Sequence, residues 1–255
     1  MNAENENKNK VQSVETAFSI VKFIQDQNGS RVTDIANELD MSKGSVHRYL
    51  STLRDLGYLV KEDGLYHLGL GFLELGHQTK YRHEISEITE TKVEQLAEET
   101  GERAQFVMEE GGKGIYIHVV GGENAVLTDT QIGKEINLTT AGCGKAILSH
   151  LPEERVNDII DQHGFVENNQ NAITDRNQLF KELKTVSEQG YALNRNEHID
   201  GLWGIGAPIL DPDGEVVGAI SIGGPTNRIK PRIENGEIVE KIVGVANEIE
   251  LHLAY

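Results

Sequence analysis

The chain has little of what stabilises small secreted folds or builds metal centres. Its 255 residues include one cysteine, which excludes a disulfide framework within the chain and a cysteine-rich zinc site. No run approaches the roughly 18 apolar residues of a membrane helix, and the polar start, MNAENENKNK, lacks the apolar segment of a signal peptide. These absences predict a cytoplasmic protein with no membrane partner, long enough to bury a core without crosslinks.

Positive charge is also scarce, and it is distributed unevenly. Lys and Arg number 24 against 41 Asp and Glu, which gives a net charge of −17. Such acidity disfavours nucleic acid as a partner, because phosphates attract cations. However, residues 1–80 carry a net charge of only −2, whereas residues 81–255 carry −15. This asymmetry indicates two domains with different partners, and the acidity also fits a salt-rich cytoplasm.

The first seventy residues have the pattern of three short helices followed by a hairpin. Apolar residues at helical spacing follow the polar tail until Asn28-Gly29, a second helix is expected to begin with Thr33 as its N-cap, and a third runs from Ser42 to a stop at Gly57. Asp63-Gly64 between two β-prone runs indicates a hairpin. Together, these elements predict a winged helix-turn-helix domain.

The rest of the chain alternates short β-like runs with helices. Helices are expected over residues 85–100, 145–150, 152–163, 175–189 and 233–253, and strands over 104–109, 114–120, 125–130, 202–210 and 216–223. An antiparallel sheet flanked by helices buries both kinds of apolar face, so the sequence predicts an α+β fold.

One face of the third helix has the composition of a helix that binds DNA. Val46, Leu50 and Leu53 point one way, and small polar or basic residues occupy the opposite arc. Hydroxyls and arginine reach phosphates and guanine edges in the major groove, and a helix N-terminus offers free N–H groups to a phosphate. The predicted DNA contacts, including one residue before the second helix and one in the wing turn, are Arg31, Ser42, Lys43, Gly44, Ser45, His47, Arg48, Ser51, Thr52 and Lys61.

The sequence blocks of both parts resemble the IclR family of transcriptional regulators. Residues 11–76 are similar to the family's N-terminal domain, and LTTAGCGKAIL (138–148) and GLWGIGAPILDPDGEVVGAISIGGP (201–225) are similar to its effector-binding domain. The resemblance implies a dimeric or tetrameric regulator of double-stranded DNA, with a GAF-like C-terminal domain that senses a small molecule such as an organic acid. The expected divisions are a disordered tail (1–10), the winged helix-turn-helix domain (11–69), a linker helix (70–82) and the effector-binding domain (83–255).

The resemblance also implies that three segments line an effector pocket. These are the loop at Gly142-Cys143, the segment 196–200 and the strand 221–223. The predicted effector-binding residues are Gly142, Cys143, Glu197, Asp200, Ser221 and Gly223. The N–H groups of the glycine-rich turn suit a carboxylate or phosphate. A place at a helix N-terminus predicts a lowered pKa for the Cys143 thiol, although a lone cysteine is more often a small buried apolar residue.

Two other functions compete with a regulator. The first is an enzyme acting on a small organic acid, but the sequence has no P-loop spacing, no nucleophile elbow and no metal-ligand spacing, so we expect no catalytic residue, cofactor or metal. The second is a winged-helix module that binds protein. The basic residues His47 and Arg48 on the third helix argue against this alternative. The sequence leaves repressor and activator, and dimer and tetramer, as open alternatives.

Overall fold

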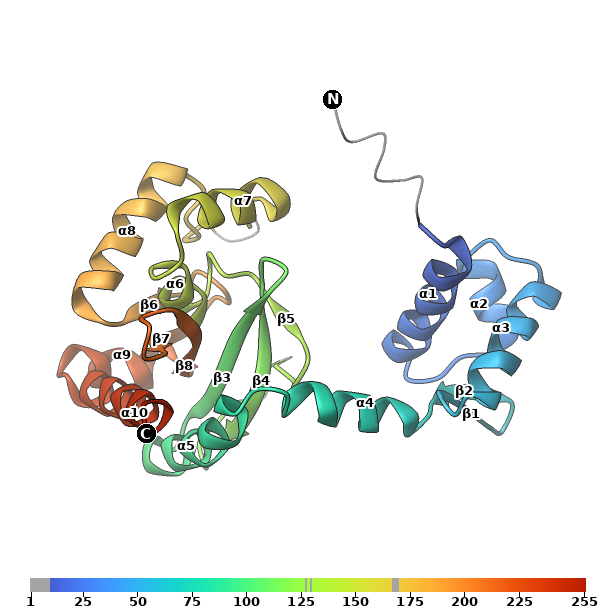
Figure 1. Cartoon of the computed structure of the whole chain (residues 1–255), viewed down its shortest axis with the longest axis horizontal. Helices are drawn as coiled ribbons and strands as arrows, with labels where there is room; N and C mark the ends of the chain where they lie inside the picture. Colours follow the sequence, from blue (N-terminus) through green and yellow to red (C-terminus); the bar gives the residue numbers. More distant parts are fainter. Residues whose placement is uncertain (1–9, 127, 129, 167–169) are drawn as a thin grey trace. The chain divides into compact units, whose positions relative to one another are not determined.

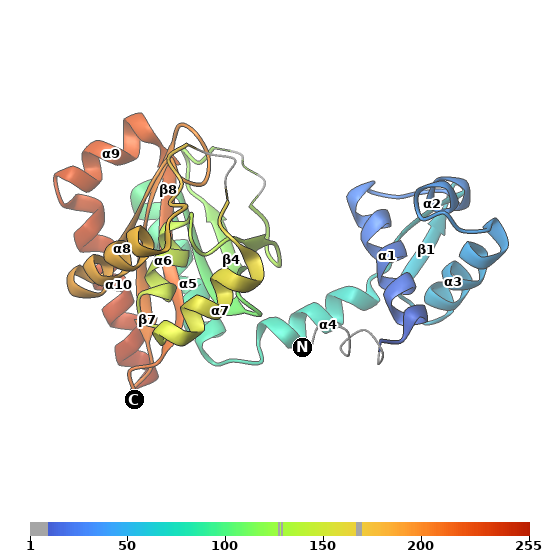
Figure 2. The ribbon, with the colours of Figure 1, turned by 90° about the horizontal axis from the view of Figure 1, so that it is seen from above.

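The computed structural model describes residues 10–126, 128, 130–166 and 170–255. The chain divides into two compact units, Met1–Tyr81 (unit 1) and Arg82–Tyr255 (unit 2), which are described separately (Figures 1 and 2). Of the predicted disordered tail, residues 1–9 lie outside the described part of the chain. No helix in the described ranges combines the length and the apolar character needed to cross a bilayer.

Unit 1 is a three-helix domain with a two-stranded wing, as the sequence predicts. Its core contains Ile20 and Ile24 from the first helix, Leu50 from the third and Tyr66 from the wing, all at most 1% exposed. Its elements are α1 (Gln12–Asp26), α2 (Val32–Glu38), α3 (Lys43–Asp55), β1 (Leu59–Glu62), β2 (Leu65–Leu68) and α4 (Gly71–Lys80).

Local hydrogen bonds fix where the helices of unit 1 begin. The Ser42 hydroxyl accepts the Ser45 N–H at 3.1 Å, so Ser42 caps α3 as expected. The prediction that Thr33 caps α2 is wrong, because the helix begins two residues earlier, at Val32, with Arg31 as its N-cap. There the Arg31 N–H donates to the Asp34 carboxylate at 3.4 Å. The start of α2 is therefore set by a carboxylate inside its first turn.

Unit 2 is a six-stranded antiparallel sheet with helices on both faces, which confirms the α+β fold class. The strand order is β5-β4-β3-β8-β7-β6. Helices α5, α9 and α10 pack on one face and α6, α7 and α8 on the other, each over its own apolar core (Figure 1). The elements are α5 (Ile85–Thr100), β3 (Arg103–Glu110), β4 (Lys113–Gly121), β5 (Glu135–Ile136), α6 (Gly142–Leu148), α7 (Glu153–His163), α8 (Arg176–Gln189), β6 (Ala192–Arg195), β7 (Leu202–Leu210), β8 (Val216–Pro225), α9 (Thr226–Glu234) and α10 (Glu237–Leu253).

Several details of unit 2 differ from the sequence prediction. The expected strand at 125–130 is absent from the described residues of that stretch, and Leu127 and Asp129 lie outside them. The edge strands β5 and β6 and the helix α9 are not predicted. The predicted final helix, 233–253, begins only at Glu237, because Gly236 has a φ of +87° and interrupts the chain between α9 and α10. A left-handed glycine ends one helix and redirects the chain into the next.

Helix α6 lies unusually close to strand β7, and this contact places the N-terminus of α6 against the sheet. A Cβ atom built on Gly206 would lie 2.4 Å from the Cys143 nitrogen, and one built on Gly142 would lie 3.0 Å from the Gly206 nitrogen. Backbone therefore packs on backbone, and glycine is required at the contact because any side chain would separate the two elements.

This contact predicts opposite effects for two glycine-to-alanine changes in unit 2. We expect Gly206→Ala to destabilise the protein by about 1–3 kcal/mol, the usual cost of overpacking a filled core. The matched change, Gly244→Ala in the exposed face of α10, has no atom within 4 Å to meet and should stabilise by about 0.5–1 kcal/mol. Urea unfolding of both variants measures the difference, and equal stabilities would show that α6 can move away from β7.

Candidate functional site

The third helix of unit 1 presents the predicted polar arc to solvent. Val46 and Leu50 are buried beneath it. Ser42, Lys43, Gly44, His47, Arg48 and Thr52 are exposed, whereas Ser45 and Ser51 are half-buried. Gly44 has no neighbour nearer than 4.0 Å to a built Cβ, so this part of the helix surface is open.

The cations of this arc are not neutralised. In the described part of the chain, neither Lys43 nor Arg48 forms an ion pair, and the Arg48 guanidinium instead donates to the Ser45 hydroxyl at 3.5 Å. Most arginines of unit 2, by contrast, bind carboxylates, as Arg155 binds Glu109 at 2.7 Å. A carboxylate-free basic face on an acidic protein is available to an external anion.

The two outlying predicted contacts flank this helix in sequence. Arg31 is exposed at the start of α2, with its guanidinium 3.8 Å from a Cβ built on Gly64 in the wing turn. Lys61 lies in strand β1 rather than in the turn where the sequence placed it, and its ammonium lies 5.2 Å from the centre of the Tyr66 ring. The wing thus carries Lys61 on its first strand, and its turn lies close to Arg31.

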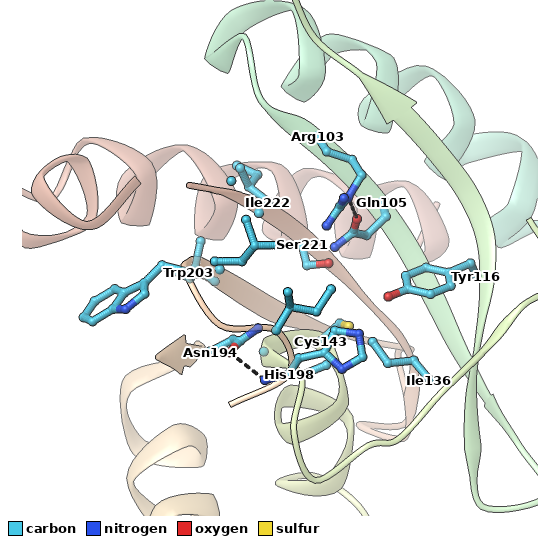
Figure 3. A pocket seen from close by; sticks show the side chains of 18 residues that line it. Arg103, Gln105, Tyr116, Ile136, Cys143, Asn194, His198, Trp203, Ser221 and Ile222 are labelled. Carbon is cyan, nitrogen blue, oxygen red and sulfur yellow. Dashed lines mark hydrogen bonds between the residues drawn. The ribbon is translucent and has the colours of Figure 1, made fainter. Parts of the chain in front are cut away.

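A separate, small cavity of about 30 Å³ lies in unit 2, between the sheet, the N-terminus of α6 and the segment that joins β6 to β7 (Figure 3). This space holds little more than water, and ligand pockets are usually much larger, so a small-molecule ligand enters only if the walls of the cavity move apart. Its lining residues are Arg103, Gln105, Tyr116, Ile136, Ala141, Gly142, Cys143, Asn194, His198, Ile199, Leu202, Trp203, Gly204, Ile205, Ser221, Ile222, Gly223 and Gly224.

The polar groups of this cavity favour a negatively charged ligand. Arg103 donates to the Gln105 side chain at 3.0 Å and to the Thr128 hydroxyl, and no carboxylate among the described residues pairs with it (Figure 3). Burial lowers the pKa of Arg103. The Ser221 hydroxyl, 3% exposed, has no hydrogen-bond partner of good geometry in the described structure. A half-buried cation and a buried, unsatisfied donor both gain from an anionic acceptor.

Strand pairing explains how these groups come together. Arg103 and Gln105 are two residues apart on β3, so they share a face. Across the ladder, Arg103 lies opposite Gly223 and Gln105 lies opposite Ser221 on β8. A Cβ built on Gly223 would meet the Arg103 guanidinium at 3.5 Å, an ordinary contact. The glycine therefore leaves room beside the arginine.

Of the six predicted effector-binding residues, four line this cavity and two do not. Gly142, Cys143, Ser221 and Gly223 are in the lining. Glu197 lies outside the lining, and its carboxylate is buried against the Lys145 ammonium, at 2.5 and 2.8 Å. Asp200 is exposed and lies outside the lining.

The sequence analysis missed several lining residues, chiefly Arg103, Gln105, Tyr116, Asn194 and His198. The alternating polar residues Arg103 and Gln105, in a strand whose other side chains are mostly apolar, were the one available signal. The Cys143 thiol also differs from expectation. Burial raises its pKa to about 11, while smaller contributions from Ser221 and Arg103 favour the thiolate. Cys143 is a buried apolar residue, not an activated nucleophile.

Two family models match this chain, one over each unit. The IclR helix-turn-helix domain matches residues 13–63, and the Bacterial transcriptional regulator IclR C-terminal domain matches residues 77–251. This chain belongs to the IclR family of transcriptional regulators.

Similar proteins agree with the IclR assignment. The probable HTH-type transcriptional regulator ArcR of Halobacterium salinarum is 31% identical, over 98% of this chain and 97% of its own. The regulator KipR of Bacillus subtilis is 30% identical, over 98% and 99%. The crystal structure of the Thermotoga maritima IclR has a TM-score of 0.81 at 28% identity, covering 96% of this chain and 99% of that one.

One further structure is an IclR homologue from Microbacterium hydrocarbonoxydans in complex with 4-hydroxybenzoate. It has a TM-score of 0.76 and 20% identity over 88% of this chain and 91% of its own, so the likeness shows a common fold. These IclR proteins and both family domains are transcriptional regulators. The present IclR chain is accordingly a DNA-binding regulator with an effector-binding C-terminal domain, and the enzyme alternative is set aside.

The raised pKa of Cys143 predicts how the thiol of this IclR regulator reacts. Only the thiolate attacks an alkylating reagent, so the rate with iodoacetamide should rise about tenfold for each pH unit between pH 6 and pH 8. A thiol activated at a helix N-terminus would instead reach a plateau within this range. Mass spectrometry measures the rates, with urea-unfolded protein as the control that reacts fastest.

Proposed function

We propose that this IclR-family regulator reads operator DNA with α3 and that a small carboxylate effector bound in unit 2 changes its occupancy of the operator. The observation that carries the first part is the carboxylate-free basic and hydroxyl arc on a Ser-capped helix of a winged helix-turn-helix domain. A recognition helix of this kind lies in the major groove. Because its partner is chromosomal DNA, the regulator works in the cytoplasm.

The arc supplies contacts of two kinds. Ser42, Lys43 and the free N–H groups of the first turn of α3 suit a phosphate. Arg48, one turn further along, is long enough to reach a guanine edge or a second phosphate. Arg31 and Lys61 are then backbone contacts on either side of the helix. Phosphate contacts set position, and Arg48 is the candidate for base selection.

A homodimer is the assembly that this reading requires. A single winged helix contacts one short half-site, and two copies related by a two-fold axis read a near-palindromic site with half-sites about one helical turn, or a multiple of it, apart. Unit 1 also exposes large apolar side chains that a partner copy would cover: Val14 (53% exposed) and Phe18 (56%) on α1, and Leu70 (83%) and Leu73 (68%) around α4. A tetramer would pair two such dimers.

The proposed effector is a small molecule with a carboxylate. Arg103 and Gln105 would hold the carboxylate, and the Ser221 hydroxyl would donate to it, which would give the guanidinium an anionic partner and Ser221 an acceptor. The complex of the Microbacterium hydrocarbonoxydans homologue with 4-hydroxybenzoate supports an acid of this class. Binding shifts the population of DNA-competent dimers, and DNA must change the affinity for the effector in return.

The DNA reading predicts the effect of Arg48→Ala. A DNA sequence selected from a random pool by the wild-type protein should contain two related half-sites. Loss of the guanidinium should weaken binding to that sequence by about 1–3 kcal/mol and relax preference at one base position if Arg48 reads a base. Titration by fluorescence anisotropy at several KCl concentrations measures the affinity and its salt slope.

The control for this experiment is Lys22→Ala, which removes an exposed cation of α1 outside the predicted contacts. Its affinity should equal that of the wild type. A pool that yields no common sequence, or equal losses for both variants, would contradict recognition by α3.

The effector reading predicts that carboxylates, but not their amides, stabilise the protein. In a panel of small aliphatic and aromatic acids that includes 4-hydroxybenzoate, at least one acid should raise the melting temperature, and the matching amide should not. Arg103→Met should remove the response, because it deletes the guanidinium while keeping an apolar side chain of similar length. The hydrogen bonds to Gln105 and Thr128 are lost as well, so the ligand-free melting temperature should fall slightly.

Arg82→Met serves as the control, because Arg82 is 63% exposed and lies outside the lining. It should respond to the same acid as the wild type does. If the acid still raises the melting temperature of the Arg103→Met variant, the anion does not bind at Arg103 on β3.

A further inference from the structure

The wall of the unit 2 cavity opposite the sheet is a short loop, residues 196–201, between β6 and β7. His198 and Ile199 of this loop are lining residues, and so is Asn194 at the end of β6 (Figure 3). Two residues with positive φ, Asn196 (+63°) and Gly201 (+80°), bracket the loop. Cys143 at the base of the cavity is 2% exposed. Access to the cavity therefore depends on where the loop lies.

A buried ion pair joins this loop to the helix below the cavity. Lys145 projects from α6, is fully buried, and donates to both carboxylate oxygens of Glu197, at 2.5 and 2.8 Å. Its ammonium also lies 3.5 Å from Glu182 of α8, which in turn accepts from Arg195 at 3.1 Å. A chain of alternating charges thus connects α6, α8, β6 and the loop.

Each residue of the ion pair lies within two positions of a residue that lines the cavity. Lys145 is two residues after the lining residue Cys143, and Glu197 immediately precedes the lining residue His198. Two other side chains of the loop make uncharged contacts: the Asn196 amide oxygen accepts from Thr226 at 2.8 Å, and His198 Nδ1 lies 3.4 Å from the Thr140 hydroxyl. The Lys145–Glu197 pair differs from these contacts because it is charged and both of its side chains are buried.

We propose that Lys145 and Glu197 are positioning residues that fasten the 196–201 loop over the cavity and so control passage into it. That the molecule entering the cavity is an effector rests on the proposed function, but the role of the ion pair in holding the loop does not. Charged hydrogen bonds in a buried setting are strong, and the loop opens when they break. The pair thereby sets the rate at which a molecule enters or leaves, while the lining residues set which molecule binds.

The pair can be removed without leaving a charge behind. A single change would leave the partner's charge buried and unpaired, which is strongly destabilising. The double variant Lys145→Met with Glu197→Met replaces both groups with apolar side chains, a change that often leaves stability unaltered. We expect it to fold with a melting temperature near that of the wild type, yet to hold the loop loosely.

Cys143 is the reporter, since it is the chain's single cysteine and lies beneath the loop. Its alkylation by iodoacetamide at pH 8 should be about 10- to 100-fold faster in the double variant, the effect of losing one charged hydrogen bond on a local opening. Amide hydrogen exchange should accelerate in residues 196–201 and stay unchanged in α10. The double change leaves the net charge as it was, so a shifted thiol pKa does not explain a faster reaction.

The control is Lys184→Met with Glu188→Met, which removes an exposed pair with a 4.0 Å separation on α8. It should leave both rates unchanged. A folded double variant with wild-type alkylation and exchange would overturn the proposal. If the double variant has a lowered melting temperature, its pattern of amide hydrogen exchange decides between the readings. Faster exchange confined to residues 196–201 supports the proposal, and faster exchange throughout the protein overturns it. Neither the alkylation rate nor the exchange rate depends on DNA or an effector. A failure of the proposed regulatory function would therefore not affect these measurements.

Discussion

The backbone contact between α6 and β7 is the constraint on which unit 2 depends. Glycines on both elements allow the helix to approach within a distance that no side chain would permit. The approach brings Cys143 to the base of the cavity and buries Lys145 beside the carboxylates of Glu197 and Glu182. The cavity, its wall and the ion pair behind the wall all follow from one close packing of backbone on backbone.

The sequence predicts best those features that depend on residues close together in the chain. The helix-turn-helix unit, its Ser42 cap and the Asp63-Gly64 turn depend on neighbours in the chain, so pattern alone locates them. Apart from local details such as the N-cap of α2, the differences concern partners far apart in sequence. Glu197 was expected to meet a ligand, but it binds a lysine 52 positions away. Arg103 was overlooked because its place opposite Gly223 depends on a strand register that local patterns do not encode.

The two units use charge in opposite ways. Unit 2 is strongly acidic, yet many of its cations pair with carboxylates within the unit, as Arg228 does with Glu102 at 2.8 Å. On α3, Arg54 pairs with Asp55 at 3.3 Å, whereas Lys43 and Arg48 of the polar arc form no ion pair in the described structure. An acidic unit 2 is repelled by DNA phosphates, which favours contact with the duplex through unit 1. Uneven charge is therefore consistent with the proposed α3 face, even though the whole chain is anionic.

Gly223 has a consequence for how such a sensor can diverge. A Cβ atom added at Gly223 would lie 3.5 Å from the Arg103 guanidinium and 3.7 Å from the Trp203 carbonyl oxygen, which are ordinary contacts. A single codon change there would reshape the chemistry beside the guanidinium while the strand ladder, the glycine contact and the loop stayed intact. The regulator therefore separates the part of its structure that must be inherited unchanged from a position where new ligand preferences can be tried.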